Sequence, residues 1–312
     1  MRVIPAVLLS LSLVSCHSAS RQAETRPLPE GAEAISLLGD TLRPLPLSDA
    51  TRSAYQARLD SAQRAVAANP ADADALIWLG RRTAYLGRYR EAIAIFTRGV
   101  ERFPSDPRFL RHRGHRWISV RETQRAATDL DHAARLVRGT PDVVEPDGLP
   151  NARGIPTSTL HTNIWYHLGL AHYLRADYAR ALEAYRACLA ASRNPDMDVA
   201  ARYWLYLTLR RLGRAAEAAA VLEPVRADLD IIENRSYHRL LLVYKGLLPA
   251  DSITRGEGVD GATTAYGLGA FMLVQGDAIQ AEYFFRRALS GGQWPSFGFI
   301  AAEAELARSG AR

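Results

Sequence analysis

The chain has 312 residues, of which 48% are hydrophobic, so it is long enough to bury a sizeable core. Its 39 Lys and Arg against 33 Asp and Glu give a formal net charge of +6, but the arginines are scattered among acidic residues, which excludes the basic stripe of a nucleic-acid-binding protein. Lys245 is the single lysine, and the phosphate-loop, HExxH, CxxC, nucleophile-elbow and EF-hand patterns are absent, so we predict no enzymatic activity and no cofactor.

The first fifteen residues have the pattern of a signal peptide. The apolar run from Val3 to Val14 is too short to span a bilayer as a helix. The segment Leu13-Val14-Ser15-Cys16 resembles the lipobox of bacterial lipoproteins. The resemblance implies that residues 1–15 are removed and that Cys16 is lipidated and becomes the mature N-terminus. The alternative is an ordinary signal peptide cut after Ser18, with Cys16 discarded.

The residues after the cysteine predict where the protein is held. In lipoproteins of this kind an aspartate after the cysteine favours the inner membrane, and here that residue is His17. The resemblance therefore implies an anchor in the outer membrane of a bacterial cell envelope, facing the periplasm. Residues 17–46 are polar and contain four prolines, so we predict that residues 16–47 form a lipidated N-terminus and a flexible tether. The apolar island Ile35–Gly39 is a candidate for docking onto the folded part.

A first helix is expected over about Ser48–Ala68, and the most regular stretch of the chain follows it at Leu76–Pro104. Two helical faces can be read in this stretch, and they are made of Leu76, Leu79, Gly80 and Thr83, and of Ala92, Phe96 and Gly99. Gly87 between them suits the end of a helix. This spacing resembles the tetratricopeptide repeat (TPR), a pair of antiparallel helices.

The pattern recurs along the chain. Gly114 and Ala126 follow Gly80 and Ala92 by 34 residues, which is the TPR period. Further repeats are expected around Gly169, Leu209 and Gly269, with a degenerate one between the last two, and Cys188 is expected to be a buried small residue. A final helix at about Phe297–Arg308 is expected to cap the end. We therefore predict an all-α fold, a TPR α-α superhelix over residues 48–312 with about five to six repeats.

An insertion loop at residues 139–162 separates the second and third repeats. Four prolines and three glycines oppose a helix there, and loops of this length are often functional. Its candidate ligand-binding side chains are Glu145, Asp147, Asn151 and Arg153. The alternative is a surface insertion without function, which a solenoid tolerates.

In the TPR family the first helix of each pair lines the concave surface. The resemblance therefore implies a partner-binding groove in which arginines and tyrosines alternate, made of Arg81, Tyr85, Arg111, His115, Tyr166, Tyr173, Tyr203 and Arg210. Such a surface suits an acidic peptide or a peptide carboxylate. The alternative is a solvated inner wall with no single ligand. The histidines of these helices lack a nearby cysteine or carboxylate, so we predict no metal site, and His172 is expected in the core.

These patterns predict a membrane-anchored TPR adaptor that binds a protein or peptide in the bacterial envelope through its concave groove. It would touch the membrane through its lipid anchor alone, and nucleic acid would not be a partner. The alternative is a binder of envelope glycans or peptidoglycan-type small ligands. A peptide would occupy several first helices at once, whereas a sugar would contact two or three tyrosines and the loop.

Overall fold

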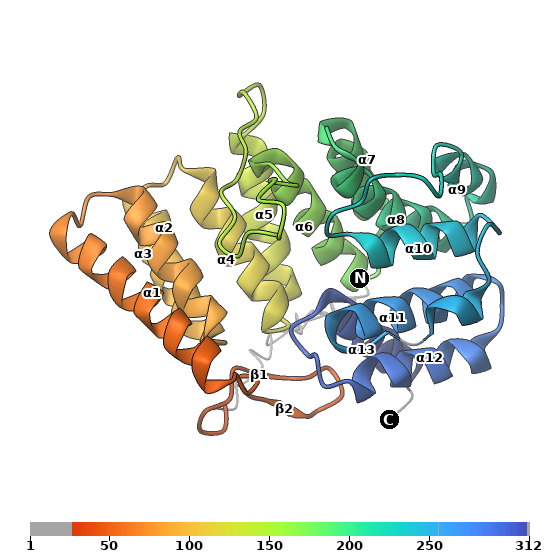
Figure 1. The fold of residues 1–312 in the computed structure, drawn as a ribbon, viewed down its shortest axis with the longest axis horizontal. Coiled ribbons are helices and arrows are strands. Elements are labelled where there is room, and N and C mark those ends of the chain that lie inside the picture. The colour runs from red at the N-terminus through yellow and green to blue at the C-terminus, as the bar shows by residue number, and fades with distance from the viewer. Residues whose placement is uncertain (1–26, 255, 311–312) are drawn as a thin grey trace, which may run out of the picture.

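The computed structural model describes residues 27–254 and 256–310, and the predicted signal peptide and Cys16 lie outside these ranges. The described residues form thirteen α-helices, one 3-10 helix and a hairpin of two short strands, so the predicted all-α fold is confirmed. Successive helices pack against each other in chain order and form a curved, TPR-type solenoid (Figure 1). Within the described ranges, every helix is too short or too polar to cross a membrane.

The helices match the predicted repeats. The first is α1 (Asp49–Ala68), which Ser48 caps by accepting a hydrogen bond from the backbone N–H of Thr51. The pairs that follow are α2 (Ala73–Tyr85) with α3 (Tyr89–Arg102), α4 (Pro107–Ser119) with α5 (Thr123–Leu136), α6 (Leu160–Leu174) with α7 (Tyr178–Ala191), α8 (Pro195–Arg211) with α9 (Ala215–Leu222), and α11 (Gly258–Val274) with α12 (Ala278–Ser290). The degenerate fifth repeat consists of α10 (Arg235–Tyr244) and the 3-10 helix η1 (Ala250–Ile253), and the last helix is α13 (Phe297–Ser309).

Four of the five regular pairs close on a glycine of the first helix, and in the α8–α9 pair Tyr206 stands at that position. A methyl group added at Gly80 would lie 2.4 Å from the ring of Phe96, so the aromatic ring packs directly on the bare backbone. The same contact, at the same spacing along the chain, joins Gly114 to Leu130, Gly169 to Tyr185 and Gly269 to Phe285. Cys188 is fully buried, as predicted for a small residue of a second helix.

Arg113 of α4 follows Leu79 of α2 by one 34-residue repeat, and its charged side chain is held by a carboxylate. Its Nε and Nη2 donate to the two oxygens of Asp129 at 2.7 and 2.8 Å, and Trp117 Nε1 donates to the same group at 3.1 Å. A bidentate pair of this kind satisfies a half-buried guanidinium. The second repeat therefore keeps the helix packing although it lacks the apolar residue.

The predicted flexible tether is wrong for its second half, because the segment before α1 is folded against the solenoid. Strands β1 (Ala34–Ile35) and β2 (Thr41–Leu42) form an antiparallel hairpin, and Ala34 and Leu42 are buried in a core shared with α1–α3, Trp294 and Phe299. Arg90 of α3 donates to the Glu33 carbonyl at 2.6 Å, and Trp294 Nε1 donates to the Arg43 carbonyl at 2.7 Å. Burial of these apolar side chains offsets the entropy of ordering the segment.

The hairpin and α13 join the two ends of the solenoid. Helix α13 covers α11 and α12, as expected of a cap, and also contacts α6. Its buried Glu303 accepts hydrogen bonds from Arg121 of the α4–α5 turn and from the backbone N–H of Leu37, so the predicted docking of the apolar island is confirmed. Figure 1 shows the hairpin running beneath the solenoid from the α1 side to the α11–α13 group.

Candidate functional site

Helices α10, α11 and α13 contact the first helices α6 and α8, on which the sequence placed an exposed groove. Tyr166, Tyr173 and Tyr203, which the sequence placed on an exposed groove, are 6%, 1% and 0% exposed. Tyr203 stacks on Tyr237 of α10 with ring centroids 4.6 Å apart, and the Tyr266 hydroxyl of α11 donates to the Tyr173 hydroxyl at 3.0 Å. The prediction of exposure is wrong for these three tyrosines, because α10 and α11 pack onto α8.

The other residues predicted to form the groove lie in two separate places. Arg210 donates through Nη2 to the Val274 carbonyl at the end of α11, 2.8 Å away, and lies apart from the others. Arg81, Tyr85, Arg111 and His115 come together. Three of the four groove tyrosines that the glycan-binding alternative could use are buried, and Tyr85 is the one that stays partly exposed. His172 is buried, as predicted.

We call the resulting cavity the arginine pocket. It has a volume of about 140 Å³, is partly open, and is lined by Arg81, Ala84, Tyr85, Phe96, Arg111, His112, His115, Arg116 and Glu145. A cavity of about 10–15 Å³ is enough to hold one water molecule, so the pocket has room for a carboxylate and several waters. Its walls are first helices α2 and α4, with Phe96 of α3 behind them and the insertion loop in front.

The pocket carries a net positive charge. Three arginines, Arg81, Arg111 and Arg116, line it against one lining carboxylate, Glu145, and the carboxylate of Asp147 lies outside the lining near Arg81. Burial lowers the pKa of Arg116 to about 10, which still leaves it protonated at neutral pH, and burial also lowers the pKa of Arg111. Burial, reinforced by the neighbouring arginines, lowers the pKa values of His112 and His115 well below 6.5, so both rings are neutral.

Two of the three arginines have no carboxylate partner among the described residues. The Arg81 guanidinium lies over the Trp78 ring at 4.3 Å and reaches the Tyr85 hydroxyl at 3.5 Å, which is a long contact. The Arg116 guanidinium lies over the Tyr89 ring at 5.0 Å. Guanidinium groups held on aromatic faces keep their forked donors available for an anion.

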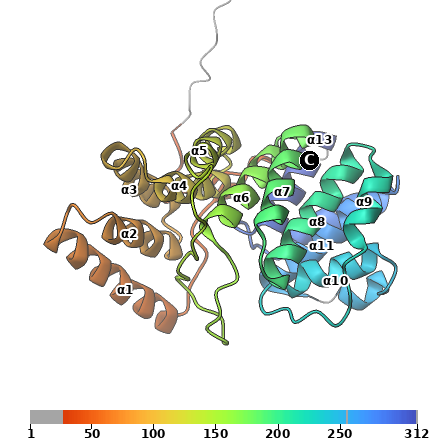
Figure 2. The same ribbon diagram turned by 90° about the horizontal axis from the view of Figure 1, so that it is seen from above.

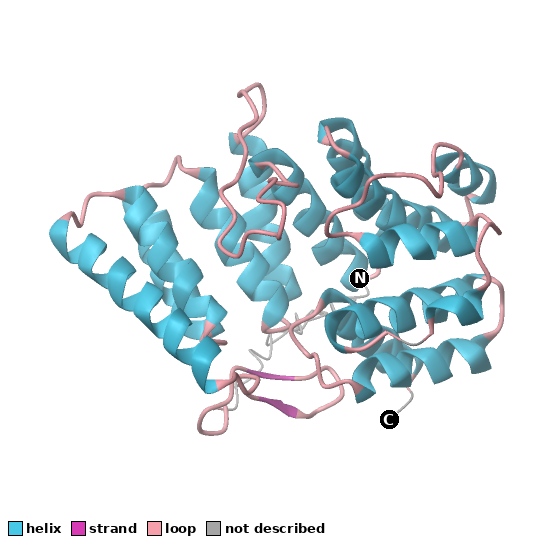
Figure 3. Cartoon of the chain, viewed as in Figure 1, coloured by secondary structure: helices cyan, strands magenta, loops and turns pink. Residues whose placement is uncertain are grey.

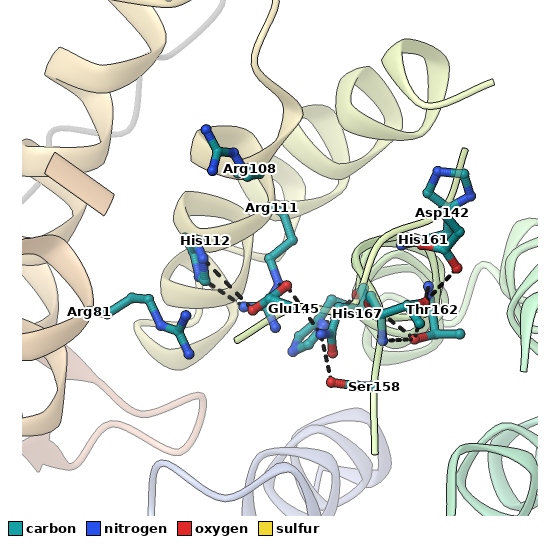
Figure 4. Close-up of polar contacts among 12 residues, drawn as sticks. Arg81, Arg108, Arg111, His112, Asp142, Glu145, Ser158, His161, Thr162 and His167 are labelled. Carbon is teal, nitrogen blue, oxygen red and sulfur yellow. Dashed lines mark hydrogen bonds and ion pairs between the residues drawn. The ribbon is translucent and has the colours of Figure 1, made fainter. Parts of the chain in front are cut away.

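Glu145 enters the pocket from the insertion loop. Its Oε2 lies 2.9 Å from Arg111 Nε and accepts from Asn163 Nδ2 at 3.1 Å. The Nε–H of Arg111 is buried and is not aligned for a hydrogen bond, so this is an ion pair by distance alone. His112 Nε2 is 3.8 Å from Oε1, and since the ring is neutral this contact is not an ion pair. Figure 4 shows Glu145 between Arg111 and His112, with Arg81 directed toward the same space.

The insertion loop ends at Thr159, because residues 160–162 already belong to α6, where the sequence predicted loop. It crosses between the two halves of the molecule (Figures 2 and 3). On one side Arg82 Nη1 donates to the Gly148 carbonyl at 2.8 Å, and Asp147 lies half-buried near the arginine pocket, where burial raises its pKa. On the other side Asn151 donates to Glu233 at 2.7 Å and Arg153 pairs with Asp230 at 2.8 Å.

Sequence reasoning missed Arg116. The predicted groove stripe passed through His115, and Arg116 lies beside it on α4. A signal was present, because Arg116 follows Arg82 by one 34-residue repeat, just as His115 follows Arg81. The first helices of the first two repeats therefore carry two adjacent polar columns, and only one of them was considered.

No protein-family model matches the chain. Among curated proteins, the chain is 27% identical over 192 residues to the heat-shock protein cognate (HSC) co-chaperone sgt12 of Aspergillus fumigatus. The match covers 61% of this chain and 49% of the relative, so the chain spans about half the length of the curated relative it matches.

Solved structures resemble the chain at lower identity. A TPR protein from Parabacteroides merdae is 18% identical, with a TM-score of 0.49 over 82% of this chain and 93% of that one. YrrB, a TPR protein with an unusual peptide-binding site, is 16% identical, with a TM-score of 0.42 over 72% of this chain and 97% of that one. MamA is 18% identical, with a TM-score of 0.42 over 57% and 91%.

Proposed function

We propose that this protein is a lipid-anchored adaptor of the bacterial cell envelope that binds an acidic protein or peptide through the arginine pocket. The observation that carries the proposal is the excess of positive charge in the pocket lining, where three arginines outnumber the one lining carboxylate, Glu145, even with Asp147 nearby. An acidic side chain or a peptide C-terminus would supply the missing anion. Charge-assisted hydrogen bonds of this type are among the stronger polar contacts in proteins.

The pocket fits an extended peptide segment better than a buried small molecule. It is partly open, and it lies where α2, α4 and the insertion loop meet. Exposed apolar side chains of the loop, Val143, Val144, Leu149 and Ile155, lie along the same segment of chain. A peptide could therefore place its carboxylate in the pocket and its neighbouring residues against the loop. Many interfaces likewise combine a few buried anchor residues with weaker contacts around them.

The proposal predicts that removing the two unpaired arginines abolishes binding. Arg81→Gln with Arg116→Gln should weaken binding of a dye-labelled hexaglutamate peptide by about 100-fold or more, since each charge-assisted contact contributes about 1.5–3 kcal/mol. Fluorescence anisotropy at constant ionic strength measures the affinity, with hexaglutamine as the uncharged peptide.

The matched control is Arg64→Gln with Arg98→Gln, which removes the same charge from exposed positions of α1 and α3. Screening at physiological salt should limit its effect to a few-fold. Equal losses in the two double variants would show that the peptide follows net charge and not the arginine pocket.

Anchoring is a separate part of the proposal and has its own test. The wild-type protein should sediment with membranes and carry acyl chains, whereas Cys16→Ser should be soluble and unacylated, because the thiol is the attachment point in the lipobox mechanism that Leu13–Cys16 resembles. Cell fractionation and mass spectrometry of the mature N-terminus are the measurements. A soluble wild-type protein that begins at Ala19 would contradict the anchor and leave the arginine pocket as the basis of the adaptor function.

A further inference from the structure

Glu145 differs from the other acidic groups that pair with buried or half-buried arginines in this molecule. Arg113 of α4 forms a bidentate pair with Asp129 of α5. Arg121 donates from Nε and Nη2 to Glu303 of α13 at 3.0 and 2.6 Å. Those carboxylates belong to helices of the scaffold and are aligned with their partners. Glu145 belongs to a loop, and the Nε–H of Arg111 makes no aligned hydrogen bond to it.

The pocket is also larger than Glu145 needs. With Glu145 in place, a cavity of about 140 Å³ remains, and Arg81 and Arg116 stay without a carboxylate among the described residues. Arg111 is 7% exposed, and its Nε is left without an aligned acceptor. An unsatisfied buried donor costs about 1–3 kcal/mol, so an anion that aligned with Arg111 and also reached its neighbours would be bound in preference to Glu145.

The loop that carries Glu145 is held mainly by polar contacts, from the hydrogen bond of Arg82 to the buried Gly148 to exposed pairs at its tip. Its ion pair between Arg153 and Asp230 is exposed on both sides, and such pairs contribute little to stability. Gly139 and Gly154 have left-handed backbone conformations at φ of 74° and 63°, and four large apolar side chains of the loop are 45–58% exposed. Release of the loop tip therefore uncovers little new apolar surface.

We infer that Glu145 is an internal ligand of the arginine pocket, and that a carboxylate of an incoming acidic peptide takes its place. This inference rests on the proposed function, because it identifies the position in the pocket that the peptide carboxylate occupies. Arg111 and Asn163 would pass from Glu145 to the peptide, while Arg81 and Arg116 would gain the anionic partner that they lack. The loop residues around Glu145 would leave the pocket mouth as the peptide enters.

The test compares the affinity of the full chain for dye-labelled hexaglutamate with and without the carboxylate of Glu145. Glu145→Gln keeps the size of the side chain but removes its charge, and it should bind the peptide about tenfold or more tightly than wild type, because a self-occupied site lowers apparent affinity by its free fraction. Asp147→Asn is the matched control, since it removes one charge from the same loop near the pocket without removing a partner of Arg111. Its affinity should rise about twofold at most through the general field.

Amide hydrogen exchange gives a second readout. The backbone N–H of Leu160 donates to the Val143 carbonyl at 2.9 Å, and that of Glu145 faces the Ser158 carbonyl at 3.4 Å. Saturating hexaglutamate should accelerate exchange at these two amides in the wild type, and in Glu145→Gln exchange should already be fast without peptide. Unchanged exchange in the presence of bound peptide would overturn the inference.

The outcomes separate the inference from the proposed function. If Glu145→Gln binds no more tightly than Asp147→Asn, while Arg81→Gln with Arg116→Gln still abolishes binding, Glu145 is not a competitor and the adaptor proposal stands. If Glu145→Gln binds more weakly than wild type, Glu145 is part of the binding surface, which also overturns the inference. If neither wild type nor Glu145→Gln binds hexaglutamate, the proposed function fails, and the inference fails with it.

Discussion

Glu303→Ala is expected to lower the free energy of unfolding by about 3–5 kcal/mol, because it leaves a buried arginine without its counter-charge. The Glu303 side chain is fully buried and that of Arg121 is 4% exposed, with Arg121 Nη2 donating to Glu303 Oε2 at 2.6 Å. The other oxygen accepts from the backbone N–H of Leu37, so the substitution also removes a partner of the N-terminal hairpin. Denaturant unfolding followed by far-ultraviolet circular dichroism measures the loss.

Two variants make this result specific. Glu91→Ala breaks an ion pair with Arg88 in which both side chains are more than 40% exposed, and it should change stability by about 0.5 kcal/mol or less. Arg121→Met combined with Glu303→Leu should recover most of the stability lost in Glu303→Ala, because no unpaired charge remains buried. A Glu303→Ala protein as stable as wild type would mean that α13 does not hold the two ends of the solenoid together.

Tyr166→Ala is expected to destabilise the protein by about 3–5 kcal/mol, although the sequence placed this residue on a binding groove. Its hydroxyl accepts a hydrogen bond from Trp204 Nε1 at 2.9 Å and lies 2.9 Å from the Tyr237 hydroxyl. Truncation would therefore open a cavity in the core and leave the buried indole N–H of Trp204 without an acceptor. Thermal unfolding and near-ultraviolet circular dichroism would report both effects.

The controls separate the ring of Tyr166 from its hydroxyl. Tyr166→Phe keeps the ring and should cost about 1–2 kcal/mol for the lost hydrogen bonds. Tyr283→Ala makes the same change as Tyr166→Ala at a position of α12 that is 57% exposed, and it should stay within about 0.5 kcal/mol of wild type. Loss of peptide binding in Tyr166→Ala without any loss of stability would show that Tyr166 belongs to the binding surface and not to the core.

The helix pairs could be predicted from the sequence because their defining contacts are local. A glycine of one helix and a large residue of the next lie a constant distance apart along the chain, as Gly80 and Phe96 do, so one turn between two helices is enough to bring them together. The same locality identified the insertion loop, whose prolines and glycines oppose a helix wherever they occur. It also placed Arg81, Tyr85, Arg111 and His115 on neighbouring first helices.

The long-range contact between Arg121 and Glu303 involves the residue that ends a first helix. The left-handed residue that ends the first helix is Gly87 in the first repeat and Arg121 in the second. A left-handed arginine costs about 1 kcal/mol relative to glycine, and the third repeat has Ala176 in the same conformation, so the position tolerates residues other than glycine. In the second repeat the residue at this position, Arg121, reaches Glu303 through its guanidinium.

By itself the sequence determined the fold class, the repeat phase and the first-helix positions of the arginine pocket, since each follows from periodicity within one or two repeats. The tertiary structure decided which of those positions stay accessible. Glu303 and Arg121 are 182 residues apart, and Trp294 and Arg43 are 251 apart, and these contacts hold α13 and the turn before it against the N-terminal part of the chain. Tyr173 is buried and Arg81 is not, because Tyr266 of α11, 93 residues further along the chain, packs against Tyr173, and no local pattern encodes that contact.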